Sequence, residues 1–315
     1  LARGGFDVIF VFETSPVTIG LPALVLRALA DVPVIFWVLD LWPESLSATG
    51  AVRSPALLSV ARQAVRFIYR RCDRLLVSSR GFVQSIRQTG GYDGTITYFP
   101  NWVEPEYLAP PATDAALPDL PAGFRIMFAG NIGAAQDFDT LLAAAEALKG
   151  EPDIQWIILG DGRRAGWVRE QVQARGLEHC FHLLGRFPAD TMTAFFGQAD
   201  AMLMSLRREP IFALTAPGKL QSYMACGRPI LACLDGEGAA LVQEAACGLA
   251  CPAERADLLA HNVRALKKMS ATDRAAMGAR GSHLNAMGAI VPARCEFAED
   301  IFSRCDMIAV DSIDS

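Results

Sequence analysis

Short apolar runs alternate with longer amphipathic stretches along the first hundred residues. Runs of this length are typical of strands that are buried on both faces, and they cover residues 7–12, 32–39, 74–78 and 96–99. The stretches between them predict helices over residues 19–30, 55–71 and 81–88. This alternation predicts a parallel sheet whose strands are joined by right-handed helical crossovers.

The same alternation returns in the second half of the chain. Strands are predicted over residues 125–129, 154–159, 181–184, 201–204 and 229–232. Helices are predicted over residues 138–148, 165–175, 189–198, 219–226, 238–246 and within 253–290. The fold class is therefore α/β, with two doubly wound, Rossmann-like parallel-sheet domains whose ligand cleft would lie between them.

Residues 103–123 interrupt this rhythm with five prolines and few aliphatic runs, which is typical of a linker. We divide the chain into an N-terminal domain (1–105), a linker (106–123), a C-terminal domain (124–290) and a C-terminal helix or tail (291–315). The chain opens on Leu1 and enters a strand almost at once, so we expect the N-terminal domain to be incomplete at its start.

Composition narrows the function classes. A net charge of −5 and a pI near 5.5 argue against nucleic acid as a partner, because a phosphate backbone requires a basic face. The eight cysteines stand singly, so we expect reduced thiols in a cytoplasmic protein. The most apolar stretch, residues 17–39, is broken by Pro22, Arg27, Asp31 and Pro33, and membrane contact would be peripheral.

Glycines follow two of the predicted strands in the second half. Gly130, Asn131 and Gly133 lie between a strand and a helix, where backbone N–H groups could receive a diphosphate. Gly160 and Gly162 repeat this arrangement after the next strand, and Arg163 beside them could pair with a phosphate. The alternative is that these are tight turns that need glycine for packing. Arg164 is expected to lie on a solvent-exposed face.

The segment Ala216–Ile230 is the most informative in the sequence. Pro217 and Gly218 shape a loop, and Lys219 lies in the first turn of the helix that follows. A lysine at a helix N-terminus favours an anion, so we predict that Lys219 contacts a diphosphate. A solvated surface lysine is the alternative.

Three further strand ends carry candidate contacts. Glu237, in the sequence Asp235-Gly-Glu-Gly, could accept hydrogen bonds from a ribose or sugar, or could cap a turn. Arg186 and Phe187 follow Gly185 and are candidates for contacting a base.

Asp40-Leu-Trp-Pro-Glu-Ser45 ends a strand of the first half. Either carboxylate, Asp40 or Glu44, could be a general base on an acceptor hydroxyl, and Trp42 could stack on a sugar. The alternative is that Asp40 or Glu44 caps the turn that follows.

Taken together, these segments resemble bacterial glycosyltransferase family 4 with the GT-B fold, in its WbuB-like branch. The resemblance is carried by Asp40-Leu-Trp-Pro-Glu-Ser, Pro100-Asn-Trp-Val, Gly130-Asn-Ile-Gly with Gln136, Leu159-Gly-Asp-Gly, the segment 217–230 and Asp235-Gly-Glu-Gly. It runs over about residues 6–290 in the same order.

The resemblance implies transfer of a sugar, with retention, from a nucleoside diphosphate sugar, often a UDP-sugar, to an envelope-glycan acceptor that is commonly lipid-linked. It also implies that no bound metal or other cofactor is needed, and that the enzyme works in the cytoplasm or at the cytoplasmic face of the inner membrane. O-antigen and capsule are typical products.

Two features of the family are replaced in this chain. The family's paired glutamates fall on Leu214 and Ser222, so Glu237 would take over the hydroxyl contact. Its basic pair after the first glycine turn falls on Asn131 and Gln136, which leaves Lys219 and Arg163 to neutralise the diphosphate.

Two other functions stay open: a nucleotide-sugar epimerase of the same fold, and a non-catalytic subunit or fragment that binds nucleotide.

Overall fold

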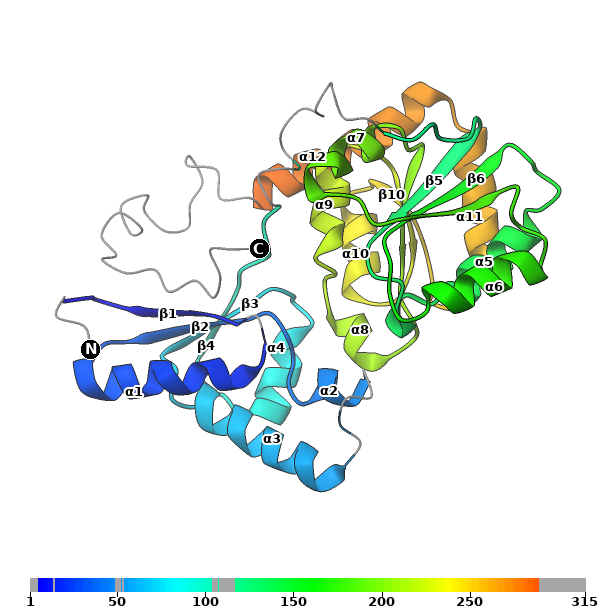
Figure 1. The fold of residues 1–315 in the computed structure, drawn as a ribbon. Helices are drawn as coiled ribbons and strands as arrows, with labels where there is room; N and C mark the ends of the chain where they lie inside the picture. The colour runs from blue at the N-terminus through cyan, green and yellow to red at the C-terminus, as the bar shows by residue number, and fades with distance from the viewer. Residues whose placement is uncertain are drawn as a thin grey trace. The chain divides into compact units, whose positions relative to one another are not determined.

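The computed structural model describes residues 5–13, 15–48, 52, 54–103, 107 and 117–288, with side chains as far as residue 282. The chain divides into two compact units: the described residues up to Asn101 form unit 1, and those from Trp102 onward form unit 2. Each unit is an α/β structure built on a parallel sheet (Figure 1).

Unit 1 contains a four-stranded sheet in the order β1-β2-β3-β4. The strands are β1 (Ile9–Phe12), β2 (Val34–Val38), β3 (Arg74–Val77) and β4 (Thr95–Tyr98). Its helices are α1 (Gly20–Ala30), α2 (Glu44–Ala48), α3 (Pro55–Tyr69) and α4 (Phe82–Ser85), which continues as a π-helix over Ile86–Gly90. α1, α3 and α4 lie on one side of the sheet, where Phe36 of β2 packs edge-on against Tyr69 of α3 (Figure 1).

Unit 2 contains a six-stranded sheet, all parallel, in the order β10-β9-β8-β5-β6-β7. The strands are β5 (Phe124–Ala129), β6 (Ile154–Leu159), β7 (Phe181–Gly185), β8 (Ala201–Ser205), β9 (Ile230–Cys233) and β10 (Gly248–Cys251). The helices are α5 (Phe138–Ala147), α6 (Ala165–Ala174), α7 (Met192–Gly197), α8 (Pro210–Leu214), α9 (Lys219–Ala225), α10 (Glu237–Glu244), α11 (Ala256–Lys268) and α12 (Ala271–Gly288).

Helices cover both faces of this second sheet, because each strand is apolar on both sides. One core lies beneath α5, α6 and α11 and includes Trp156 and Phe138. The other lies beneath α7, α9 and α10 and includes Phe195 and Tyr223 (Figure 1). The strand order is that of a doubly wound sheet, and it reverses between β5 and β8, the place where such sheets bind ligands.

The predicted fold class is confirmed for the two parallel-sheet α/β units, and the order reversal is seen in unit 2. Among the described strands of unit 1, spatial order follows chain order. The short elements α2, α8 and β10 are absent from the prediction, because four or five residues carry too little periodicity. The helical stretch predicted within 253–290 is two helices, since Met269 has extended backbone. Most of the predicted linker, and the predicted tail 291–315, lie outside the described residues.

Candidate functional site

The centre of the candidate site is the point where β5 and β8 separate. These strands are paired only at Ile126 and Met127, while β8 continues alongside β9 as far as Ser205. Beyond the separation, the hydroxyl of Tyr223 on α9 accepts the Ala129 N–H (2.9 Å) and donates to the Ala129 carbonyl (3.0 Å). Tyr223 therefore replaces the missing strand partner and fixes α9 against the end of β5.

Gly130 is the first residue beyond that strand end. Its φ of +139° is a conformation that side chains rarely adopt, and a Cβ here would collide with the Lys219 amine. Gly160, with φ +126°, ends β6 in the same way, and a Cβ on it would collide with the Gly130 carbonyl. The N–H of Gly130 donates to the Leu159 carbonyl at 2.8 Å, so the two turns are in direct contact.

Lys219 begins α9, and its amine lies beside Gly130 and 4.6 Å from the centre of the Phe128 ring. Burial lowers the pKa of this amine from 10.5 to about 8. A buried amine with a lowered pKa is stabilised when an anion binds beside it, because the anion favours the charged form. The arrangement can therefore receive an anionic group at the ends of β5 and β6.

Asn131, Gly133 and Gln136 complete the turn after β5. The Gly133 N–H donates to Oε1 of Gln136 at 3.1 Å, so Gln136 closes the turn internally. Asn131 is exposed, and its side chain lies close to both Gly133 and Gly162. The structure thus brings Gly130, Asn131, Gly133 and Gly160 together with Lys219.

The Asp235–Gly238 turn lies against the segment that leads to Lys219. Gly236 abuts Ala213 of α8, and Gly238 abuts Pro217. Asp235 holds the turn in place, since it accepts hydrogen bonds from Arg208 Nε (3.2 Å) and from the Ala253 N–H (3.0 Å). Glu237 is the first residue of α10.

The remaining predicted residues of this half follow β6 and β7. Arg163 and Arg186 are exposed, whereas Phe187 packs edge-on against Phe195 with 4.6 Å between ring centres. Arg164 is not on a solvent-exposed face as predicted. It is half-buried, because its guanidinium pairs with Asp139 at 2.7 Å and lies 3.7 Å from the Trp167 ring.

Arg207 and Tyr223 belong to the site but are absent from the sequence prediction. The Arg207 N–H donates to the Ala135 carbonyl (2.8 Å), and its guanidinium lies 3.8 Å from Asp139. Its backbone is thus joined to the turn after β5, while its guanidinium is paired with an acid of α5. The sequence signal for Arg207 was the pair Arg207 and Arg208 shortly after a buried strand. Tyr223 had no such signal, because a tyrosine inside a helix does not indicate a site.

The predicted acceptor-side residues lie together in unit 1. The Ser45 hydroxyl donates to Asp40 Oδ2 at 3.0 Å, and the Trp42 indole donates to the Ser15 hydroxyl at 3.2 Å. Glu44 is the first residue of α2. A further acid, Glu13, follows β1, is fully buried, and accepts the Leu39 N–H at 3.2 Å. Glu13 is absent from the sequence prediction, although its position directly after an apolar strand could have indicated it.

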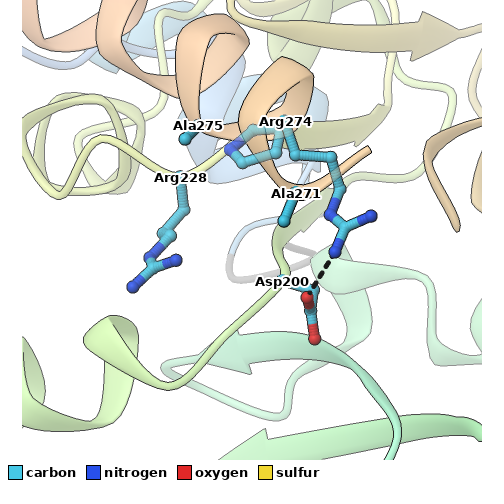
Figure 2. Close-up of a pocket in the computed structure, with 6 residues that line it drawn as sticks. Asp200, Arg228, Ala271, Arg274 and Ala275 are labelled. Carbon is cyan, nitrogen blue, oxygen red and sulfur yellow. Dashed lines mark hydrogen bonds and ion pairs between the residues drawn. The ribbon is translucent and has the colours of Figure 1, made fainter. Parts of the chain in front are cut away.

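A small depression of about 60 Å³ lies elsewhere in unit 2, between Asp200, Arg228, Pro229 and the start of α12 (Figure 2). Asp200 and Pro229 precede β8 and β9, so it lies at the edge of the sheet opposite Gly130 and Lys219. Arg274 crosses it to pair with Asp200 at 3.0 Å, and Asp200 also accepts the Arg125 N–H. We assign these residues a structural role.

The sequence analysis also predicted reduced cysteines and, at most, peripheral membrane contact. The six cysteines within the described residues are free thiols, and five of them are buried. Across the described ranges, every helix is too short or too polar to cross a membrane.

Comparison with known proteins gives two family matches, one on each half of the chain. Residues 1–102 match "Glycosyl transferase 4-like domain", and residues 123–268 match "Glycosyl transferases group 1".

Two relatives are similar in sequence. The chain is 29% identical over 229 residues to the Pseudomonas aeruginosa protein named glycosyltransferase WbjE, covering 69% of this chain and 56% of the relative. It is 29% identical over 162 residues to Escherichia coli WcaI, named a colanic acid biosynthesis glycosyl transferase, covering 49% of this chain and 39% of the relative. The chain thus spans about half the length of these relatives or less.

The fold is similar to that of Anabaena HepE, solved in complex with UDP and glucose. The TM-score is 0.67 at 17% identity, with 89% of this chain and 73% of HepE covered. Each half of the chain thus matches a glycosyltransferase domain, and the two parallel-sheet units together have the GT-B fold.

Proposed function

We propose that this protein transfers a sugar, with retention, from a UDP-sugar to a lipid-linked envelope-glycan acceptor. The observation that carries the donor half of the proposal is the half-buried Lys219, whose amine lies beside Gly130 at the point where the strand order reverses. A UDP donor is supported by HepE, whose structure contains UDP and glucose. An envelope acceptor is supported by WcaI, which is named for colanic acid biosynthesis.

In this proposal, unit 2 holds the donor. Lys219 and the backbone of Gly130–Gly133 receive the diphosphate, with Arg163 nearby. Glu237 receives a ribose or sugar hydroxyl, and the segment from Gly185 to Phe187 contacts the base. When the bond to the sugar breaks, negative charge grows on the departing diphosphate, and a fixed positive charge there lowers the barrier by several kcal/mol.

Unit 1 supplies the acceptor side. Asp40 or Glu44 takes the proton of the attacking hydroxyl, and Trp42 positions the acceptor. Retention is proposed from the family resemblance. No bound metal enters this proposal, so EDTA is expected to leave turnover unchanged; loss of turnover with EDTA and its recovery with Mg²⁺ would contradict that part.

Peripheral membrane contact is proposed through the outer face of α3. Leu57, Val60 and Phe67 on that helix are 60%, 67% and 47% exposed. Residues 55–71 contain four arginines and no acidic residue, which favours an anionic lipid surface. Co-sedimentation with phosphatidylglycerol vesicles should fall in Val60→Ser, whereas Leu29→Ser, on α1 and 70% exposed, serves as the control.

The test of the proposed function measures UDP release from a panel of UDP-sugars, with a membrane extract as acceptor source. Wild type is expected to release UDP only when acceptor is present, and Lys219→Ala is expected to abolish release while leaving the fold intact. Conversion of the donor without acceptor would indicate an epimerase. Wild-type turnover in Lys219→Ala would contradict the donor site.

A further inference from the structure

Buried polar atoms without a hydrogen-bond partner are concentrated at one place in unit 1. Across the residues that the structure describes, four side chains have such an atom, and three of them are Glu13, Glu44 and Tyr69. Glu13 is fully buried, and Tyr69 is 1% exposed. Buried polar groups are almost always hydrogen-bonded, so three exceptions in one cluster require an explanation.

The three side chains come from separate elements and converge. Glu13 follows β1, Glu44 begins α2, and Tyr69 ends α3. The Tyr69 hydroxyl is close enough to Glu13, Glu44 and Asp40 for their negative charges to raise its pKa, although burial is the larger cause. Among the described residues, Asp40 and Tyr69 therefore interact with Glu13, while Glu44 and the Cys72 thiol interact with Tyr69.

Glu13 also holds the backbone that carries the acceptor-side acids. Its Oε2 accepts the N–H of Leu39 at 3.2 Å, and the Asp40 backbone also hydrogen-bonds the carboxyl. Its other oxygen, Oε1, has no partner among the described residues. Leu39 and Asp40 are where β2 ends and the turn toward Glu44 begins.

An ionised carboxylate at this position would be costly. Burial of a charge strongly favours the neutral form, and the charge that acts on Glu13 is that of another acid, Asp40. In agreement, burial raises the pKa of Glu13 well above its usual range, and the Asp40 charge raises it further, while the hydrogen bonds from the backbone of Asp40 and Leu39 offset only part of this.

We propose that Glu13 is held as a neutral carboxylic acid and acts as a positioning residue for the turn that carries Asp40 and Glu44. As an acid, it keeps a carbonyl oxygen for the Leu39 N–H and gains an O–H donor for the cluster. It also adds no negative charge behind Asp40 and Glu44. The proposal rests on the proposed function only in taking these two residues as acceptor-side carboxylates.

Two measurements test the protonation state of Glu13. Neither uses donor or acceptor, so their results do not depend on the glycosyltransferase activity. The infrared difference spectrum of wild type minus Glu13→Gln at pH 7 should show a protonated carboxyl band. The wild-type free energy of unfolding should fall as pH rises above 4.5, because the unfolded chain loses this proton while the fold retains it. Glu13→Gln should make that slope shallower, and Asp93→Asn, an exposed acid of unit 1, should leave it unchanged.

A carboxylate band instead of a carboxyl band would show that Glu13 is ionised and would overturn the proposal. So would a Glu13→Gln variant whose free energy of unfolding falls with pH as steeply as that of wild type. The positioning role is tested by comparing Glu13→Gln with Glu13→Leu in the transfer assay. The amide retains the hydrogen bond to Leu39 and should retain turnover, whereas the leucine variant should raise KM for the acceptor. Equal turnover and KM in both variants would overturn that role, and the infrared result remains decisive if the leucine variant does not fold.

Discussion

Lys219→Met should stabilise the protein and at the same time weaken its binding of nucleotide. Methionine has a similar length and is apolar, so it can occupy the same space beside Gly130 and the Phe128 ring. The substitution removes a half-buried positive charge that the fold keeps at a cost. Opposite effects on stability and binding are expected of a residue whose charge serves a ligand.

The cost follows from the pKa of the amine, which burial lowers from 10.5 to about 8. This difference corresponds to about 3 kcal/mol against the charged form in the folded state. The contact with the Phe128 ring, at 4.6 Å, recovers about 1–2 kcal/mol of that cost. We therefore expect Lys219→Met to raise the free energy of unfolding at pH 7 by about 1–2 kcal/mol.

The effect of Lys219→Met on the free energy of unfolding also depends on pH. Below pH 8 the amine is charged in both the folded and unfolded chain, so the full cost is present. Between pH 8 and 10.5 the Lys219 amine is mostly neutral in the folded chain but still protonated in the unfolded chain. The wild-type free energy of unfolding therefore rises with pH over this range. Lys219→Met should lack this rise.

Urea unfolding at pH 7 and pH 9.5, with and without UDP, measures both effects. Wild type should gain about 2.7 kcal/mol with UDP at a hundred times its dissociation constant. Lys219→Met should lose most of that gain, whereas Lys268→Met, at an exposed position on α11, should behave as wild type. The reasoning is refuted if Lys219→Met is less stable than wild type without UDP, or if UDP stabilises both equally.

Three other substitutions in unit 2 test how this site is built. Gly130→Ala should destabilise by about 1–3 kcal/mol and lower UDP affinity, because of the positive φ and the collision with the Lys219 amine; Gly197→Ala, where a Cβ has no atom within 4 Å, is the thermal-melt control. Tyr223→Phe should cost about 1–3 kcal/mol in urea unfolding, since it leaves the Ala129 N–H and carbonyl without a partner; unchanged stability would contradict this. Burial raises the pKa of Asp137, so wild-type stability should fall as pH rises above 3.8, and Asp137→Asn should be the more stable protein at pH 7. Equal stability of the two at pH 7 would show that Asp137 carries no such cost.

The long elements of the fold could be predicted from the sequence because their patterns are local. The apolar run 154–159 is β6 to the residue, and the helix predicted at 219–226 is α9 with one residue fewer. The strand order could not be predicted, because it depends on pairings between segments far apart. The point where β5 and β8 separate, which centres the site, is visible only in the structure.

The candidate site was predictable only in part, for a similar reason. The glycine turns and Lys219 carry local signals, since glycines that follow strands and a lysine at a helix start are visible in the sequence. Tyr223 acts on Ala129, which is 94 residues away, and Glu13 acts on Leu39 across a strand and a helix. Such partners belong to the tertiary fold, so no short pattern indicates them.

A crystal structure of the protein with UDP would test the central claim most directly. The account predicts both phosphates within hydrogen-bond distance of the Lys219 amine and of the backbone N–H groups of residues 130–133. Density for UDP at another place, with the Lys219 amine still packed against Phe128 and Gly130 and without contact to phosphate, would contradict it.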